Sequence, residues 1–265
     1  MGEAKQKSRS RAAILASEPR CIYCANLPTT LEHMPPVSMF QRRQRLSGME
    51  YAACEPCNVG TRAADVAATL MAHISPYTFA EDWRVAELPR LISTLDQLAP
   101  GLRGEIVQGS NPRRTWRLGP RGLYQAGIEA RADGPILKRH LTVFTAKMGM
   151  ALYREHVGSA LPIDGGVFTA WFLNAGLPPQ AAETILSIMP SGGSLKQGRQ
   201  HSIEQFAYRY NCDDRSILAA MVGFHSNFHL LVIATSDPVT YAPVINRQFF
   251  DFVRVGELAD RLAST

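Results

Sequence analysis

The chain has 265 residues, 46% of them hydrophobic and 19% charged, with 28 Lys and Arg against 23 Asp and Glu. This apolar share is enough for a hydrophobic core and excludes a wholly disordered protein, which combines low hydrophobicity with high net charge. No stretch reaches the roughly 18 apolar residues of a membrane-spanning helix, and residues 1–20 form a basic tail without the apolar core of a secretory signal. We therefore expect a soluble, cytoplasmic protein with no membrane partner.

The net charge of +5 is concentrated in the first two thirds of the chain. Residues 1–75 hold 9 Lys and Arg against 6 Asp and Glu, residues 76–158 hold 12 against 8, and residues 159–265 hold 7 against 9. Arginine clusters can neutralise phosphates and release counterions, although each cluster alone is also typical of a solubilising surface. The residues predicted to contact nucleic acid are Arg42, Arg43, Arg45, Arg113, Arg114 and Arg117.

Four of the five cysteines form two CxxC pairs, Cys21 with Cys24 and Cys54 with Cys57, and Cys212 stands alone. Two such pairs separated by a few tens of residues predict a tetrahedral zinc site, because each tight turn supplies two thiolates. Redox pairs are the alternative, but these usually occur singly. Four thiolates leave no open position for water, so the predicted zinc is structural.

The segment between and after the cysteine pairs contains polar residues beside helix and strand signals. Glu32 and His33 lie in a short extended piece that ends at two prolines. After Cys57 comes Asn58, and apolar residues then recur at steps of three and four from Ala63 to Ile74. This spacing predicts a helix that begins just after Asn58.

The order CxxC, Glu-His-x-x-Pro, CxxC-Asn and helix resembles the HNH endonuclease family, in its zinc-stapled branch with Glu-His and Cys-Asn. The resemblance covers about residues 21–75. It implies a two-stranded hairpin packed on one helix, with a catalytic divalent metal between them. It also implies that His33 is the general base and that Glu32 and Asn58 hold the metal. Gly60 and Asp65 match recurrent positions of this branch.

These residue types suit phosphodiester hydrolysis. A histidine can deprotonate water near neutral pH, and carboxylate and amide oxygens are suitable ligands for Mg²⁺ or Mn²⁺. Arg62, near the helix start, is expected to reach the scissile phosphate. Neighbouring residues on a strand point to opposite sides, so Glu32 and His33 would need a local twist to serve one site.

Each residue also has a plain structural interpretation. Asn58 could cap the helix, His33 could be a structural histidine near the zinc, Glu32 a solvated carboxylate and Arg62 an exposed helix cation. The middle asparagine of the family's signature has no clear counterpart, and Glu50 or a backbone carbonyl is the expected substitute.

From Phe79 onward we recognise no family motif, and the sequence predicts a mixture of helices and strands. Helices are expected at 84–98, 136–156 and 178–189, and strands near 115–118 and at 205–210, 216–224 and 228–235. Trp116 is expected to have core contacts, with stacking on a base as the alternative.

The predicted fold class is therefore α+β, with a small N-terminal zinc-stapled ββα-metal module at residues 21–78. A larger mixed α+β region at 79–265 is expected to provide substrate grip, dimerisation or partner docking. The predicted function is an HNH-type endonuclease acting on DNA, with RNA as the other possible substrate, in a phage-defence or mobile-element setting. The alternative is a non-catalytic zinc module that binds nucleic acid or a protein.

Overall fold

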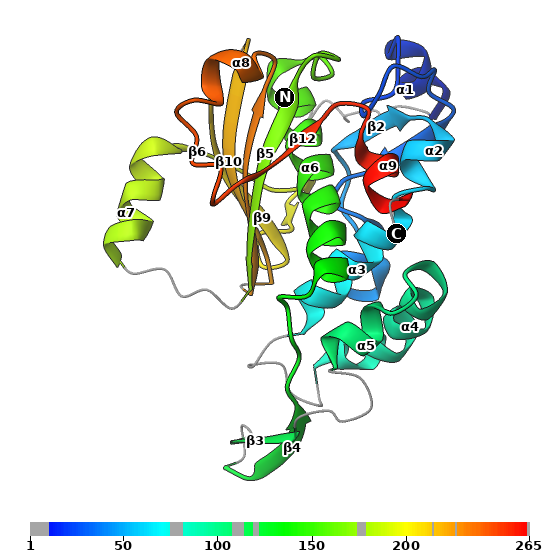
Figure 1. The fold of residues 1–265 in the computed structure, drawn as a ribbon, viewed down its shortest axis with the longest axis vertical. Helices are drawn as coiled ribbons and strands as arrows, with labels where there is room; N and C mark the ends of the chain where they lie inside the picture. Colours follow the sequence, from blue (N-terminus) through cyan, green and yellow to red (C-terminus); the bar gives the residue numbers. More distant parts are fainter. Residues whose placement is uncertain are drawn as a thin grey trace.

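The computed structural model has an α+β fold and describes residues 11–74, 82–107, 114–118, 122–173, 179–213, 215–225 and 227–263. Three layers follow one another in Figure 1: a β-sheet, the long helix α6 (Pro135–Val157), and the N-terminal part of the chain on the other side of α6. The fold class predicted from the sequence is confirmed.

The N-terminal part contains the expected β-β-α unit. Strand β1 (Thr30–His33) pairs antiparallel with β2 (Glu50–Ala53), with His33 directly opposite Glu50. A short helix α2 (Glu55–Asn58) and then α3 (Arg62–His73) follow the hairpin. The loop between the two strands holds two 3₁₀ turns, η1 (Val37–Met39) and η2 (Gln41–Arg43), and the short helix α1 (Arg11–Ser17) precedes the unit.

Helix α3 is buried more completely than its sequence pattern predicts. Every residue of α3 after Arg62 is buried, whereas the spacing of apolar residues indicated a single apolar face. The reason is that α3 packs between α4 (Trp83–Leu98) and α6. Its many alanines permit this close approach because they add little volume between neighbouring helices.

The main sheet has six strands, all paired antiparallel, in the order β12-β5-β11-β10-β9-β6. Buried and half-buried residues alternate along β10, since one face packs on α6. Gly149 of α6 sits against this face, and a Cβ atom there would lie 2.6 Å from Cγ1 of Val167. The strands are β5 (Gly166–Leu173), β6 (Ser191–Gly193), β9 (Phe206–Cys212), β10 (Ile217–Phe224), β11 (Phe228–Thr235) and β12 (Asp251–Arg254).

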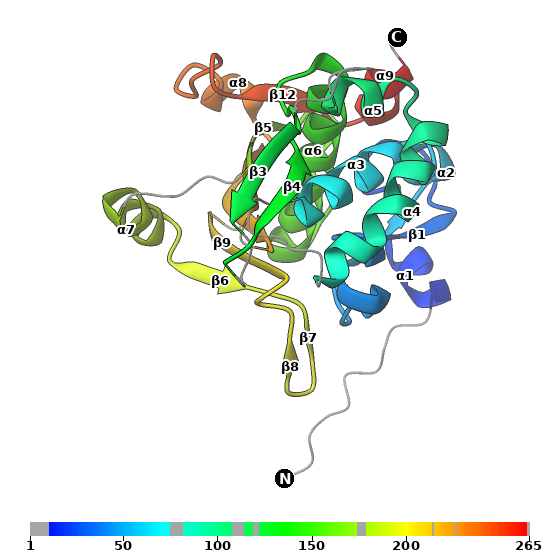
Figure 2. The ribbon, with the colours of Figure 1, turned by 90° about the horizontal axis from the view of Figure 1, so that it is seen from below.

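The three strands predicted near the C-terminus are β9, β10 and β11, and the three predicted helices are α4, α6 and α7 (Pro179–Ile188). Strands β5 and β12 were not predicted. Figure 2 shows the hairpin of β7 (Lys196–Gln197) and β8 (Gln200–His201) extending away from the sheet. The other elements are β3 (Arg114–Leu118), β4 (Tyr124–Ile128), α5 (Leu102–Ile106), α8 (Pro238–Tyr241) and α9 (Leu258–Ala263).

A single continuous cluster of buried apolar residues runs from Cys21 to Leu258, through the β-β-α unit, α6 and the sheet. The boundary expected between residues 78 and 79 falls in 75–81, outside the described residues. Among the helices of the described ranges, none is long and apolar enough to cross a membrane.

Candidate metal centre and hydrolytic site

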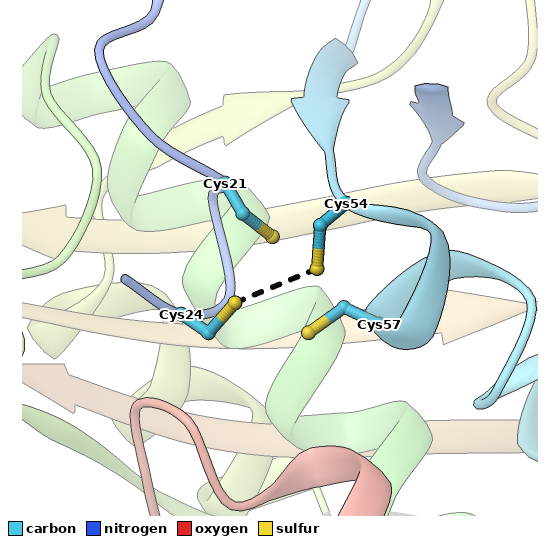
Figure 3. A group of neighbouring side chains, drawn as sticks. All are labelled: Cys21, Cys24, Cys54 and Cys57. Carbon is cyan, nitrogen blue, oxygen red and sulfur yellow. Dashed lines mark hydrogen bonds between the residues drawn. The ribbon is translucent and has the colours of Figure 1, made fainter. Parts of the chain in front are cut away.

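The four paired cysteines meet in one buried cluster at the base of the hairpin (Figure 3). Cys21 and Cys24 come from the turn before β1, whereas Cys54 and Cys57 lie at the end of β2 and in α2. Their sulfur atoms all lie within 4.8 Å of one another, and the Sγ atoms of Cys24 and Cys54 are 3.5 Å apart. This arrangement could hold a zinc ion with four thiolate ligands.

The surroundings of the cysteines also fit a zinc ion. The backbone amides of Tyr23 and Asn26 donate to the sulfurs of Cys21 and Cys24, as amides commonly do around metal-bound thiolates. Burial raises the pKa of Cys24, whereas a hydrogen bond with Cys57 lowers the pKa of Cys21 to about 5, so the cluster favours a thiolate at Cys21. The closed set of four sulfurs assigns such an ion a structural role.

Glu32 lies on the inner side of β1 and is 3% exposed. Its Oε2 atom is 3.4 Å from Nζ of Lys147, a fully buried residue of α6. The same ammonium donates to both carboxylate oxygens of Asp65 at 2.7 Å. Glu32, Lys147 and Asp65 therefore form a buried charged triad between the β-β-α unit and α6.

Burial dominates the electrostatics of this triad. It raises the pKa of Glu32 to about 7, although the Lys147 ammonium opposes the rise, and it also raises the pKa of Asp65. Burial disfavours the charge of Lys147, but the two carboxylates hold the pKa of its ammonium above the ordinary value. The triad therefore consists of a Lys147–Asp65 ion pair with two hydrogen bonds and a Glu32 carboxyl whose pKa is about 7.

A divalent cation held by Glu32 does not fit this arrangement. Lys147 already supplies a positive charge beside the carboxylate, and a second cation there would be repelled at short range. The Nδ2 atom of Asn58 donates to Oγ1 of Thr30 at 3.0 Å and to the carbonyl of Leu31 at 2.9 Å, and these bonds do not use Oδ1, the atom that would bind a metal. Lys147 therefore occupies the place of a cation beside Glu32, and the role of Asn58 as a metal ligand stays a prediction.

Asn58 ends α2 and does not cap α3, whose N-cap residue is Thr61. Through its hydrogen bonds to Thr30 and Leu31, the Asn58 amide connects α2 to β1. Gly60 then permits the turn between the two helices, because a Cβ atom at this position would lie 2.2 Å from the carbonyl oxygen of Pro56. This contact gives a structural reason for glycine at residue 60.

His33 lies on the outer side of β1, with a side chain that is 40% exposed. Its Nε2 atom is 3.9 Å from Oε1 of Glu50, the residue opposite it in the hairpin. Partial burial and the nearby Arg45 guanidinium lower the pKa of His33 below 6.5, against the pull of Glu50. His33 is therefore a neutral, solvent-accessible imidazole at pH 7, with a carboxylate beside it.

Arg45 differs from its expected role as a nucleic-acid contact. Its side chain is 3% exposed, and its guanidinium donates to carbonyls of the β1–β2 loop, including Met34, Pro35 and Gly48. The prediction failed because a sequence cluster does not reveal which arginine turns inward. Arg45 holds the loop that positions His33.

The other predicted cationic residues lie in several places. Arg42 and Arg43 are exposed on η2, and Arg62 is exposed at the first residue of α3. Arg114 is exposed on β3, the same strand carries Arg117, and Arg113 lies outside the described residues. Trp116 on β3 is 68% exposed, which corrects the expectation of core contacts for this residue.

Lys147 is the important residue that the sequence analysis missed. With histidine counted as neutral, it is the only charged residue in the mostly apolar run from residue 140 to 153, which the structure buries. A lone lysine in a buried run is seldom unpaired, and this could have indicated a carboxylate partner. It could not have identified Glu32 and Asp65.

Comparisons with protein-family models, with curated proteins and with solved structures find no match to this chain.

Proposed function

We propose that this protein is an endonuclease of the HNH type that hydrolyses phosphodiester bonds in nucleic acid, with DNA as the substrate and His33 as the base. The observation that carries the proposal is the neutral imidazole of His33, half-exposed at the end of β1, beside the Glu50 carboxylate in a cysteine-stapled β-β-α unit.

In this proposal His33 takes a proton from water as the water attacks the phosphate, the P–O bond to the leaving part of the strand breaks, and the leaving oxygen takes a proton from solvent. Nε2 faces Glu50, so Nδ1 is the nitrogen left to accept the proton. The charge that then forms on the imidazole is stabilised by Glu50, which occupies the role of the family's missing middle asparagine. The proposal includes no step at a metal held by Glu32 and Asn58, since the Lys147 ammonium already lies beside the Glu32 carboxyl.

The test is cleavage of supercoiled plasmid by purified protein, with added Mg²⁺, with added Mn²⁺ and with neither. His33→Ala should lower the cleavage rate by about 10²–10⁴-fold, the usual contribution of a general base. The matched control is His201→Ala, because His201 is an exposed histidine on β8, outside the β-β-α unit. Equal cleavage by wild type and His33→Ala, at equal zinc content, would refute the role of His33.

A second candidate is a zinc-stapled module that binds nucleic acid without cutting it. The pairing of Glu32 with Lys147 favours this alternative, because it removes the carboxylate that would hold a catalytic cation. Retention of DNA in a gel-shift assay, with no nicking under any of the three cation conditions, would support this second function.

A further inference from the structure

A small cleft beside the β-β-α unit brings together three arginines from three separate elements. Arg43 comes from η2, Arg62 from the start of α3, and Arg90 from the middle of α4. The cleft has a volume of about 160 Å³. Its other lining residues are Pro36, Val37, Ser38, Asp65, Val66, Leu91 and Thr94.

Two of the three guanidinium groups lie exposed and are not hydrogen-bonded within the described part of the chain. Among the described residues, no hydrogen bond or ion pair is formed by the side chain of Arg43 or Arg62, and both residues are exposed. Arg90 pairs with Glu87 at 2.6 Å on the surface of α4, and its side chain is 44% exposed. The cleft therefore presents more positive charge than its own residues neutralise.

The one acidic residue of the cleft, Asp65, offsets only part of this charge, and the charge of Arg62 in turn lowers the pKa of Asp65. The carboxylate of Asp65 is bound through both oxygens by Lys147, on the buried side of α3. Arg62 is also the first residue of a 12-residue helix, where the helix dipole adds partial positive charge. The positive charge that remains in the cleft favours the binding of an anion.

The backbone of η2 turns its two arginines toward different clefts. Arg42 and Arg43 have φ angles of 52° and 59°, a left-handed conformation that residues other than glycine rarely adopt. Arg43 lines the three-arginine cleft, whereas Arg42 lines a separate cleft with Gln44 and Gln205. Strained backbone of this kind is concentrated at binding sites.

We propose that the cleft of Arg43, Arg62 and Arg90 binds a phosphate group. Its volume is well below the roughly 300–1,000 Å³ of sites that enclose a whole small molecule, so it suits one phosphate of a longer strand. Planar guanidinium groups bind phosphate oxygens in pairs, which a lone lysine cannot do. This inference deepens the proposed function and rests on its substrate class, but it does not require that the protein cuts.

The test measures binding apart from cutting. Fluorescence anisotropy of a labelled DNA duplex is followed with His33→Ala protein, without added divalent cation, over a range of salt concentrations. Arg43→Ala, Arg62→Ala and Arg90→Ala should each weaken binding by roughly 5- to 10-fold. Each should also reduce the slope of log K against log salt by about 1, as loss of one phosphate contact does.

The matched control is Arg103→Ala, since Arg103 is an exposed arginine of α5 that lies outside the cleft. Arg62→Lys keeps the charge and should recover part of the affinity. If the three cleft variants bind DNA with the affinity and salt slope of Arg103→Ala, the phosphate site is refuted.

Competition with inorganic phosphate and with a mononucleotide identifies the source of the bound group. If the cleft binds a phosphate within the DNA strand, inorganic phosphate and the mononucleotide should both displace the duplex only weakly. Displacement of the duplex by millimolar phosphate from wild type, but not from the arginine variants, would support the same site with a free phosphate as its ligand. Absence of plasmid cleavage would contradict the nuclease proposal and leave this binding result unaffected.

Discussion

Glu32 and His33 are neighbours on β1, but their side chains lie in opposite environments. Glu32 faces the buried ammonium of Lys147, whereas His33 faces solvent and Glu50. Alternation along a strand produces this difference, and no twist brings the two side chains to one site. At the scale of the residue, Glu32 therefore belongs to a buried ion cluster, whereas His33 is available to a substrate from solvent.

The first prediction at this scale concerns the pH dependence of cleavage. A histidine base is active when neutral, so the rate should rise with pH through the His33 pKa, with a midpoint below 6.5. Glu50 raises this pKa, so Glu50→Gln should move the midpoint to lower pH. Glu55→Gln, at an exposed carboxylate of α2, is the control. A Glu50→Gln profile that coincides with the wild-type profile would exclude Glu50 as the partner of the base.

The second prediction concerns the stability of the buried triad. Lys147→Met leaves Glu32 and Asp65 without a counterion and should lower the free energy of unfolding by about 3–5 kcal/mol. Urea denaturation at pH 7 measures this change. The triple variant Lys147→Met, Glu32→Gln, Asp65→Asn should recover most of the loss, because it leaves no uncompensated buried charge.

The triad also predicts how stability changes with pH. The pKa of Glu32 is raised in the folded protein to about 7 from an ordinary value of 4.5, so folding favours the protonated carboxyl. This contribution is complete below about pH 4.5 and is lost as the pH rises through 7, a change of about 3 kcal/mol. Compared with wild type, Glu32→Gln should lose less stability between pH 5 and pH 8. Parallel stability curves for the two proteins would contradict the raised pKa.

At the scale of the element, the cysteine cluster joins segments that are too short to be stable alone. Strands β1 and β2 have four residues each, and α2 has four. A two-stranded hairpin of this length is marginal in water. The four sulfurs connect the turn before β1 to the start of α2, so a bound zinc would hold the hairpin and the helix together.

The prediction at this scale is that Cys57→Ser releases zinc and unfolds the β-β-α unit. Mass spectrometry of metal content should give about one zinc per wild-type chain and a large loss in the variant. Circular dichroism should show reduced helix content. Cys212→Ser, which lies on β9 far outside the cluster in sequence, should keep both the zinc and the helical signal. Cys57→Ser protein with full zinc and unchanged helix content would contradict the assignment.

At the scale of the whole molecule, α6 connects the two sides of the structure (Figure 1). Lys147 and Glu155 of α6 bind Asp65 and Tyr51 of the β-β-α unit. Gly149 of the same helix packs on the sheet, close to Val167 of β5. One helix therefore fixes the candidate site against the C-terminal sheet.

The prediction at this scale concerns the contact between α6 and the sheet. Gly149→Ala places a methyl group 2.6 Å from Cγ1 of Val167, so it should destabilise the protein by about 1–3 kcal/mol. Thermal or urea unfolding measures the change. Gly104→Ala is the matched control, because a Cβ atom at this exposed position of α5 meets nothing within 4 Å. This control should be neutral or slightly stabilising, and equal stability of the two variants would refute the close approach.

The sequence by itself determined the features that depend on local spacing. The CxxC pairs predicted the four-cysteine cluster, apolar periodicity predicted α3, and the length and composition of short segments predicted the strands β9 to β11, because these signals are contained in neighbouring residues. Only the tertiary structure decided that Lys147 lies between Glu32 and Asp65, that Arg45 is buried, and that Arg90 shares a cleft with Arg43 and Arg62. These contacts join segments far apart in the chain, and the charge of a side chain does not specify whether packing places it against a partner, a carbonyl or water.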